Sequence, residues 1–175
     1  MTTTPERIIE VALDLFSEQG YEATSMRHIA AALGLSPGAF YHHFPSKEAV
    51  LVAVCLPLVD GMVRFAEEAK ATPDVGVAML EPYLDVLLAH GRLLRLVAGD
   101  VAVFRVPDIG PPIREASETI KQALETSTGA DPLVVGCAIG ALHGGAQAFV
   151  GEEDDAPIAR SLILRSVQLL LKESS

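Results

Sequence analysis

The fold is decided by residues 24–47, which read TSMRHIAAALGLSPGAFYHHFPSK. Their pattern predicts two short helices joined by a tight turn. Thr24 or Ser25 can cap the first helix, because a hydroxyl accepts a hydrogen bond from an unpaired N–H of the first turn. Gly34 stands where that helix must end, since glycine tolerates the left-handed backbone found there. Ser36 can cap the second helix in the same way.

The spacing of side chains in the second helix indicates which of them face outward. Pro37 suits the first helical position, where no N–H is needed. Phe40 and Phe44 are four residues apart and share one face, so we expect both to point inward. Tyr41 and His42 then point away from the core. This is the pattern of a helix-turn-helix, whose second helix enters the major groove of DNA.

Several strings in this region carry a family resemblance: Ile29-Ala30, Leu33-Gly34-Leu35-Ser36, Phe40-Tyr41-His42-His43-Phe44 and Ser46-Lys47-Glu48. They resemble the tetracycline-repressor (TetR) family of bacterial transcriptional regulators. The resemblance is specific up to about Leu51 and rests on the layout of helices beyond it. It implies a DNA-binding domain over residues 1–60, with its motif at about 25–44. It also implies a ligand-binding and dimerisation domain over residues 61–175.

Composition places the whole chain in the all-α class. Half of its 175 residues are hydrophobic, and no alternating pattern of β-strands with hairpin turns is present. We expect about nine helices. The longest uninterrupted apolar run, residues 49–58, is too short to span a bilayer. The N-terminus lacks the apolar region of a signal peptide. We therefore expect a cytoplasmic protein with no membrane partner.

The charge distribution constrains how such a protein can bind DNA. The net charge is −10, and residues 1–50 hold three Lys or Arg residues against six acidic ones. Four of those acids lie on or just after the expected first helix, away from the second helix of the motif. A weak non-specific electrostatic attraction is expected, so affinity must depend on specific contacts.

The resemblance and the spacing together assign contacts to double-stranded DNA. We assign His42 to base edges, and Tyr41 and Lys47 to phosphates. The neighbouring DNA backbone is assigned to Ser25, Arg27 and Ser36, and Pro37 and Gly38 present a slim helix end to the groove. The alternative for Tyr41 is that it packs inside the motif.

The remaining chain reads as further helices separated by Pro and Gly. We expect helices over residues 4–19, 46–71, 74–89, 92–103, 113–127, 131–150 and 157–172, with a loop at 106–112. Pro57 and Gly61 are expected to interrupt the helix over 46–71, and Pro82 to bend the one over 74–89. A bend at Pro57 either shifts the DNA-binding module or only sets a static packing angle.

A pocket for a small molecule is implied in the central and later helices. His143 and Gln147 share a helical face with apolar residues, as in many ligand sites. The candidate lining is Met62, Phe65, Met79, Tyr83, Leu87, Phe104, His143 and Gln147. Ordinary core packing, with His143 as a hydrogen-bonded core histidine, explains the same residues. Because the lining is mainly apolar, an apolar effector is favoured.

Small and apolar residues of the last two helices predict a homodimer. Gly136, Gly140 and Gly144 recur every four residues, which suggests close approach by another helix. Leu164 and Leu171 lie on a second apolar side of the terminal helix, where a partner could cover them. The resulting hypothesis is a dimeric repressor that a small effector releases from a palindromic operator. The alternative is a DNA-binding dimer without ligand control.

Motifs of enzymes and metal sites are not found in the sequence. A glycine-rich phosphate loop, Gly-x-Ser-x-Gly, His-Glu-x-x-His and Cys-x-x-Cys are all missing. We expect no cofactor, no metal and no catalytic residue, although a small helical enzyme carrying a motif of this kind is a third reading. Cys55 and Cys137 are expected to be buried, with a redox-sensing pair as the alternative.

Overall fold

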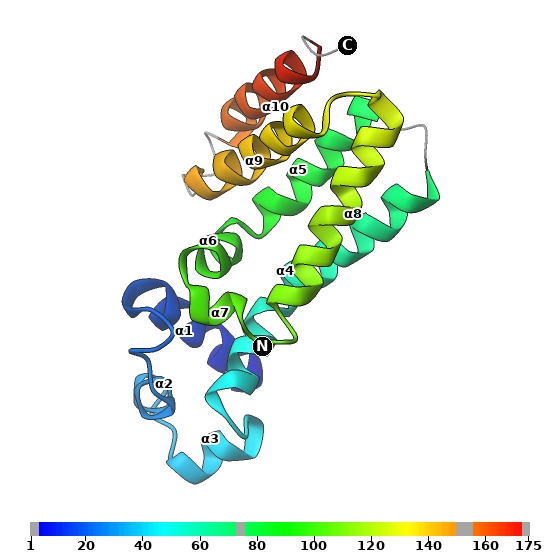
Figure 1. The fold of residues 1–175 in the computed structure, drawn as a ribbon. Coiled ribbons are helices and arrows are strands. Elements are labelled where there is room, and N and C mark those ends of the chain that lie inside the picture. Colours follow the sequence, from blue (N-terminus) through cyan, green and yellow to red (C-terminus); the bar gives the residue numbers. More distant parts are fainter. Residues whose placement is uncertain (1–3, 73–75, 150–155, 173–175) are drawn as a thin grey trace. The chain divides into compact units, whose positions relative to one another are not determined.

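The computed structural model describes residues 4–72, 76–149 and 156–172. These form ten α-helices and one short 3₁₀ helix without any strand, which confirms the all-α prediction (Figure 1). The elements are α1 (Thr4–Gln19), α2 (Met26–Ala32), α3 (Pro37–His43), α4 (Lys47–Ala71), η1 (Gly76–Met79), α5 (Leu80–Ala89), α6 (Gly91–Gly99), α7 (Val101–Phe104), α8 (Gly110–Thr128), α9 (Pro132–Ala148) and α10 (Ala156–Lys172).

The helices form two units. The first consists of the chain up to Pro57 together with Arg95–Pro111, and the second consists of Leu58–Leu94 together with the chain from Pro112 onward. Helices α4, α6 and α8 each begin in one unit and end in the other. The segment Arg95–Pro111 thus groups with the N-terminal helices, which a simple division near residue 60 does not anticipate.

The core of the first unit is built from one apolar face of each N-terminal helix. Ile8 and Phe16 of α1, Ile29 of α2, Phe40 of α3 and Leu51 of α4 are each at most 1% exposed. Burying a side chain of this size contributes about 1.5–3 kcal/mol. The short helices α2 and α3 are held mainly by this shared core, because isolated helices of seven residues are not stable in water.

Helix α4 runs unbroken from Lys47 to Ala71, so the expected interruption at Pro57 and Gly61 is wrong. Pro57 lies inside the helix on its exposed side. Gly61 serves a packing contact instead. A Cβ atom there would lie 3.2 Å from the Val86 side chain and 3.6 Å from the ring of His90. The missing side chain lets α4 and α5 approach closely.

The segment after α4 also differs from expectation. Residues 73–75, which include the expected helix start at Asp74, lie outside the described part of the chain. Beyond them, η1 precedes α5. Pro82 falls in the first turn of α5, where proline needs no hydrogen-bond partner. The expected helix over 92–103 is two helices, because Asp100 ends one and caps the next.

The proline-rich loop expected at 106–112 is shorter than predicted. Helix α8 already begins at Gly110, and the two following prolines occupy its first turn. A side chain at Gly110 is sterically impossible, since a Cβ atom would lie 1.6 Å from the Phe104 carbonyl oxygen. Glycine is needed here because the chain turns back closely on α7.

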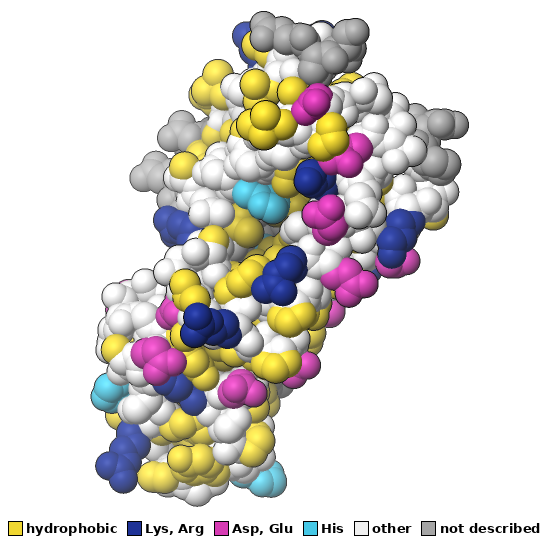
Figure 2. All heavy atoms as spheres, viewed as in Figure 1, with side chains coloured by type: hydrophobic (Ala, Val, Ile, Leu, Met, Phe, Trp, Pro, Cys, Tyr) yellow, Lys and Arg dark blue, Asp and Glu magenta, His cyan; other side chains and the backbone are white. Residues whose placement is uncertain are grey.

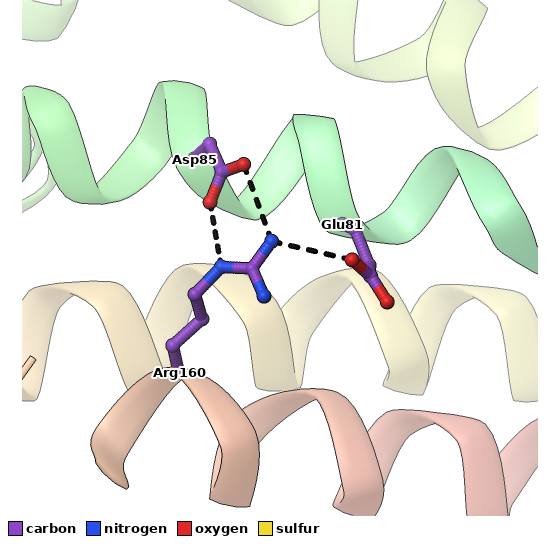
Figure 3. A network of polar contacts seen from close by, with 3 residues as sticks. All are labelled: Glu81, Asp85 and Arg160. Atoms are coloured by element: carbon purple, nitrogen blue, oxygen red, sulfur yellow. Dashed lines mark hydrogen bonds and ion pairs between the residues drawn. The ribbon is translucent and has the colours of Figure 1, made fainter. Parts of the chain in front are cut away.

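In the second unit, α9 packs between α5 and α10 (Figure 1). Gly145 of α9 makes the close approach to α10, since a Cβ atom there would lie 2.7 Å from the Ile163 side chain. Arg160 of α10 adds a polar tie to α5 (Figure 3). Its Nε and Nη2 atoms donate to the two carboxylate oxygens of Asp85 at 2.8 and 3.2 Å, and Nη2 also reaches Glu81 at 3.4 Å.

The two cysteines lie in different environments. Cys55 is buried in α4, and burial raises the pKa of its thiol to about 12. Cys137 is exposed on α9, so the expectation that both are buried is wrong for this residue. The two are free thiols in the structure.

Helix α4 is the one described helix that is long and apolar enough to cross a membrane. Its most apolar stretch has a mean hydropathy of 1.9, and 56% of that stretch is buried within the protein. A buried core helix has the same features, so this observation is weak evidence for a membrane span.

Candidate nucleic-acid interface

The helix-turn-helix begins with a reciprocal cap on α2. The Ser25 hydroxyl accepts a hydrogen bond from the His28 N–H at 3.2 Å, and His28 Nδ1 accepts one from the Ser25 N–H at 3.4 Å. This is a capping box with histidine in the place usually taken by Glu or Gln. Thr24 is buried, and its hydroxyl donates to the Gly20 carbonyl at 2.9 Å. Ser25 is therefore the cap.

The turn and the start of α3 follow the sequence prediction. Gly34 has a φ of +65°, the left-handed conformation that favours glycine. The Ser36 hydroxyl caps α3 by accepting the Ala39 N–H at 3.2 Å, and Pro37 occupies the first helical position. These local bonds fix the direction in which α3 leaves the turn.

Two phenylalanines anchor α3 and orient its outer face. Phe40 is 1% exposed and Phe44 is 9% exposed, whereas Tyr41 is 54% exposed. Tyr41 therefore does not pack inside the motif. The exposed residues of the helix are Pro37, Gly38, Ala39, Tyr41, His42 and His43. Small residues at the N-terminal end and polar rings further along give a face that can enter a groove.

The Lys47 side chain points to the backbone of its own chain, whereas a phosphate contact would need it to point outward. Its Nζ donates to the Tyr21 carbonyl at 2.9 Å and to the Glu22 carbonyl at 3.4 Å. The ammonium also lies 4.2 Å from the centroid of the Tyr21 ring, within the range of a cation–π interaction. Lys47 therefore fastens the α1–α2 turn to the start of α4, which spacing along the sequence does not reveal.

Asp100 holds the same turn from the other side. One carboxylate oxygen caps α7 by accepting the Ala102 N–H at 2.9 Å, and the other accepts the Tyr21 N–H at 3.3 Å. Burial, followed by the charges of Glu48, Glu22 and Asp100, raises the pKa of Tyr21. Tyr21, in this turn, thus has both its backbone N–H and its carbonyl bound by side chains. Nothing in the sequence near Asp100 indicated this role.

The charge of α2, α3 and their caps differs from that of the whole chain. Residues 25–46 contain no acidic residue, one arginine and three histidines. Arg27, His28, His42 and His43 are all exposed. Over α2 and α3, Figure 2 shows histidine and Lys or Arg side chains among hydrophobic ones. This face is therefore locally free of the acidic charge that dominates elsewhere.

The same N-terminal residues match a known family. Residues 8–54 match the model of the bacterial regulatory proteins of the tetR family. This N-terminal stretch is that of a tetR-family protein. The match covers most of α1, all of α2 and α3 and the first part of α4, which build the face just described.

Individual relatives extend this result. The chain is 47% identical over 55 residues to the uncharacterized HTH-type transcriptional regulator YerO of Bacillus subtilis; the aligned part is 31% of this chain and 19% of that protein. It is 45% identical over 65 residues to the HTH-type transcriptional regulator UidR of Escherichia coli, 37% of this chain and 33% of that protein. The chain thus spans a third or less of these two relatives.

A solved structure is similar over nearly the full length. The crystal structure of a transcriptional regulator from Aquifex aeolicus is 27% identical, with a TM-score of 0.73, over 96% of this chain and 99% of that one. The helical second unit therefore has a counterpart of known fold. A third curated relative, the HTH-type transcriptional regulator Mb3439c of Mycobacterium bovis, is 31% identical over 124 residues, 70% of this chain and 62% of that protein.

Seven of the eight predicted pocket residues lie in the second unit, and Phe104 lies in the first. Of the seven, Met62, Phe65, Met79, Tyr83 and Leu87 are buried, while His143 and Gln147 are half-buried. The Phe65 and Tyr83 rings stack with centroids 5.0 Å apart. The Tyr83 hydroxyl is hydrogen-bonded to His143 Nε2.

Burial sets the protonation of this tyrosine–histidine pair. Burial raises the pKa of Tyr83 and lowers the pKa of His143. A hydrogen bond with Ser117 partly offsets the rise for Tyr83. At neutral pH the phenol is protonated and the imidazole is neutral. A neutral imidazole carries one N–H proton, and its tautomer decides whether Tyr83 or His143 donates in this hydrogen bond. The pair forms a polar centre inside an otherwise apolar core.

Two hollows of the second unit lie elsewhere, along the seam between α4 and α8. One has a volume of about 210 Å³ and the other about 230 Å³, and both are bordered by Lys70 and Thr119. Apolar walls come from Val63, Ala66 and Ala116. These hollows do not include any of the predicted pocket residues.

The predicted dimer residues fall on two different sides. Gly136, Gly140 and Gly144 have open space around the position of a Cβ atom, so they make no close helix contact within the protomer. Leu164 and Leu171 are buried in the protomer, at 6% and 2% exposure, so the expectation that they lie on an outer side is wrong. The exposed apolar residues of α9 and α10 are Leu133, Ile158, Leu162, Leu169 and Leu170. In Figure 2, hydrophobic side chains gather over α10.

Proposed function

We propose that this chain is a dimeric, sequence-specific DNA-binding transcriptional regulator of the cytoplasm, a repressor released from a palindromic operator by a small, largely apolar effector. The observation that carries the DNA-binding part is the outer face of α3. Phe40 and Phe44 are buried, whereas Tyr41 and His42 are exposed beside an N-terminus that carries no bulky side chain. Such a helix can place three or four side chains against base edges.

We assign each DNA contact to a residue on or beside this face of α3. His42 reads base edges, and Tyr41 donates its hydroxyl to a phosphate. Arg27, Ser25 and Ser36 border the adjacent backbone, although both serine hydroxyls already accept a capping hydrogen bond. A hydroxyl has a second lone pair and a proton to donate, so capping does not preclude a phosphate contact. Lys47 contributes through the turn that it fastens.

Selection of bound duplexes from a random DNA pool tests this part directly. We expect an enriched inverted repeat, because two-fold symmetry of a dimer requires a matching symmetry in its operator. The separation of the half-sites should be near one helical turn, roughly 34 Å, or depart modestly from it. A pool that shows no enrichment after repeated rounds would contradict the proposal.

The dimer is supported by the surface of α9 and α10. Leu162 and Leu169 are 60% and 55% exposed on α10, and the open side of α9 carries Gly136, Gly140 and Gly144. Small residues on one helix and exposed leucines on the other allow four helices, two from each protomer, to pack closely. Leu162→Glu with Leu169→Glu should give a monomer in sedimentation velocity. Leu164→Glu should instead damage the fold, because Leu164 is buried.

The effector is supported by the polar centre around Tyr83 and His143. A tyrosine and a histidine in an apolar core can orient a small molecule through one or two hydrogen bonds. Binding there shifts the protein between two states only as far as the molecule prefers one of them. Helices α4, α6 and α8 run from this unit into the DNA-binding unit and provide covalent routes for the change.

A DNA-binding dimer without an effector is the second candidate. It is favoured by the hydrogen bond between Tyr83 and His143 and by the stacking of Phe65 on Tyr83, which together fill the site with the protein's own side chains. A thermal-shift screen with small apolar compounds separates the two, because a molecule that binds only the folded protein raises its melting temperature. An effector must lose its stabilising effect in Tyr83→Ala and must release wild-type protein from the selected duplex.

A further inference from the structure

Helix α10 has two apolar stripes on opposite sides. The inner stripe packs within the protomer, and its members are at most 6% exposed: Leu164, Val167 and Leu171. The members of the outer stripe are at least 55% exposed: Ile158, Leu162 and Leu169. At about 100° per residue, the two stripes lie roughly half a turn apart. Each consists of three branched aliphatic side chains, so burial of apolar surface alone does not decide which stripe faces the protein.

Each stripe also includes one arginine. Arg160 lies one turn before Leu164 on the inner stripe, and Arg165 lies three residues after Leu162 on the outer stripe. An arginine cannot lose its charge when it is covered. Covering it without a carboxylate partner is therefore unfavourable. The stripe that can face the protein is the one whose arginine finds partners there.

The inner arginine has such partners on α5, within the same unit (Figure 3). Arg160 donates from Nε and Nη2 to the two carboxylate oxygens of Asp85 at 2.8 and 3.2 Å, and from Nη2 to Glu81 at 3.4 Å. A bidentate pair fixes the direction of the guanidinium as well as its distance. Asp85 and Glu81 are four residues apart on α5, so both can face one guanidinium.

This cluster is suited to fixing an orientation. Its side chains are between 34% and 56% exposed, so its contribution to overall stability is small. Its geometry, however, is satisfied in one rotation of α10 only. A half-turn would carry Arg160 away from α5 and turn Arg165 toward the protein. Arg165 lies about 7.5 Å further along the helix axis, so it would not meet the two carboxylates in the same geometry.

We propose that the cluster of Arg160 with Asp85 and Glu81 fixes the rotation of α10 about its axis and so determines which apolar stripe the protein offers to a second copy of this chain. This inference rests on the proposed function, which assigns the outer stripe to a dimer. Arg160 is a positioning residue, because it acts on the partner surface through the helix that carries it. An ion pair that selects one of two similar packings is a known use of such groups.

The close approach of α9 and α10 does not replace this role. Ile163 occupies the space that a Cβ atom on Gly145 would fill. After a half-turn of α10, Ser161 would face α9 there, and a serine is smaller than an isoleucine. Gly145 therefore accepts either rotation.

The test measures the reaction of a maleimide with a cysteine introduced on the inner stripe by Val167→Cys, resolved by mass spectrometry of the peptides. Arg165→Gln is present throughout, so that the outer arginine does not oppose rotation. Cys137 is exposed on α9 and reports whether a partner covers this surface, while Cys55 is buried and reports global unfolding. Arg160→Gln should speed the reaction at the introduced cysteine at least about ten-fold, because losing hydrogen bonds from a charged group shifts an equilibrium by that factor or more.

Backbone amide exchange distinguishes rotation of α10 from its unfolding. A rotated helix keeps its backbone hydrogen bonds, so its amides should stay protected while the introduced cysteine becomes reactive. A helix that unfolds locally loses both kinds of protection together.

A charge exchange between the two helices is the matched control. Arg160→Glu alone brings three carboxylates together and should react at least as fast as Arg160→Gln. Arg160→Glu with Asp85→Arg restores opposite charges across the same pair of helices and should return the reaction to near its slow rate. Rescue of this kind is not expected if Arg160 matters only for its size.

Self-association gives a second readout. With the two stripes matched by Arg160→Gln and Arg165→Gln, each protomer holds the native rotation about half of the time. The dimer dissociation constant in sedimentation velocity should then rise about four-fold over that of Arg165→Gln alone, because both protomers must present the outer stripe.

Each outcome supports or overturns a stated claim. Equally slow reaction with and without Arg160→Gln would overturn the inference, as would fast reaction with loss of amide protection in α10. An unchanged dissociation constant alongside fast reaction would overturn the part that concerns the second copy. None of these results removes the proposed dimer. A wild-type chain that sediments as a monomer at every concentration would overturn that dimer, while the labelling would still decide whether Arg160 fixes the rotation.

Discussion

Replacement of Lys47 by methionine should destabilise the first unit and leave the DNA contacts themselves in place. Methionine keeps the apolar stem of lysine but removes the ammonium that donates to the Tyr21 and Glu22 carbonyls at 2.9 and 3.4 Å. It also removes the cation 4.2 Å from the Tyr21 ring centroid. Both interactions hold the turn that leads into α2.

The magnitude follows from these contacts. A hydrogen bond from a charged group contributes about 1.5 kcal/mol at the lower end of its range, and a half-exposed cation–π pair about 0.5 kcal/mol. The expected loss is therefore about 2 kcal/mol, which lowers the melting temperature of a chain of this size by about 4–8 °C. Thermal unfolding followed by circular dichroism measures the shift.

Arg27→Met is the matched control, because Arg27 is exposed on α2. It should leave the melting temperature nearly unchanged, weaken binding on all sequences alike and lower the salt slope by about one. Lys47→Met should lower the melting temperature. At temperatures where it is folded, it should leave the DNA affinity and the salt slope nearly unchanged. If Lys47→Met melts like the wild type and lowers the salt slope by about one, then Lys47 is a phosphate contact and the structural role argued for it is wrong.

Three further predictions test other parts of the structure. Gly145→Val should lower the melting temperature, because its Cβ atom would lie 2.7 Å from Ile163, whereas Gly140→Ala, which has open space, should keep or raise it; equal melting temperatures would contradict the close approach of α9 and α10. Asp100→Ala should cost about 1 kcal/mol through the lost cap on α7, with Asp100→Asn retaining most of the stability, as measured by urea unfolding. Burial lowers the pKa of His143 and of His90, so the unfolded chain binds protons that the folded chain does not. Stability is then fully present above about pH 6.5 and falls as the pH drops below it, and His143→Gln should flatten this decline in melting temperature.

The local features of the helix-turn-helix could be predicted from sequence because they depend on neighbouring residues. Ser36 and Pro37 fix the start of α3, Gly34 fixes the turn, and the spacing of Phe40 and Phe44 fixes its inward face. Each rests on a hydrogen bond or a helical period within four residues. The family resemblance depends on the same stretch, and the family model matches residues 8–54, which contain it.

Features that depend on distant parts of the chain could not be predicted in this way. Lys47 binds a carbonyl 26 residues away and Asp100 an N–H 79 residues away, and no local pattern specifies either partner. The rotation of a helix about its own axis is likewise set by distant packing partners and not by local sequence. Gly136, Gly140 and Gly144 predict close approach by another helix, but within the protomer α9 makes its close approach to α10 at Gly145 and leaves that series open.

The prediction of which side of α10 faces a partner was wrong for a similar reason. Its sequence is apolar on both sides, so periodicity alone does not say which side its own unit covers. Packing against α9 buries Leu164 and Leu171 and exposes Leu162 and Leu169. The structure therefore moves the proposed interface to different residues without changing the reason for expecting one.

The central claim, that the outer face of α3 binds DNA, is tested most directly by the DNA affinity of Gly38→Glu. Gly38 is exposed in the first turn of α3, and a Cβ atom there meets nothing within 4 Å. A carboxylate near a helix N-terminus stabilises the helix by about 0.3–1 kcal/mol, so the variant should melt no lower than the wild type. The same carboxylate would face the phosphates or base edges. The account predicts loss of binding to the selected duplex, while Gly38→Gln, of the same size without the charge, binds more tightly than Gly38→Glu. A folded Gly38→Glu protein that binds this duplex as the wild type does would contradict it.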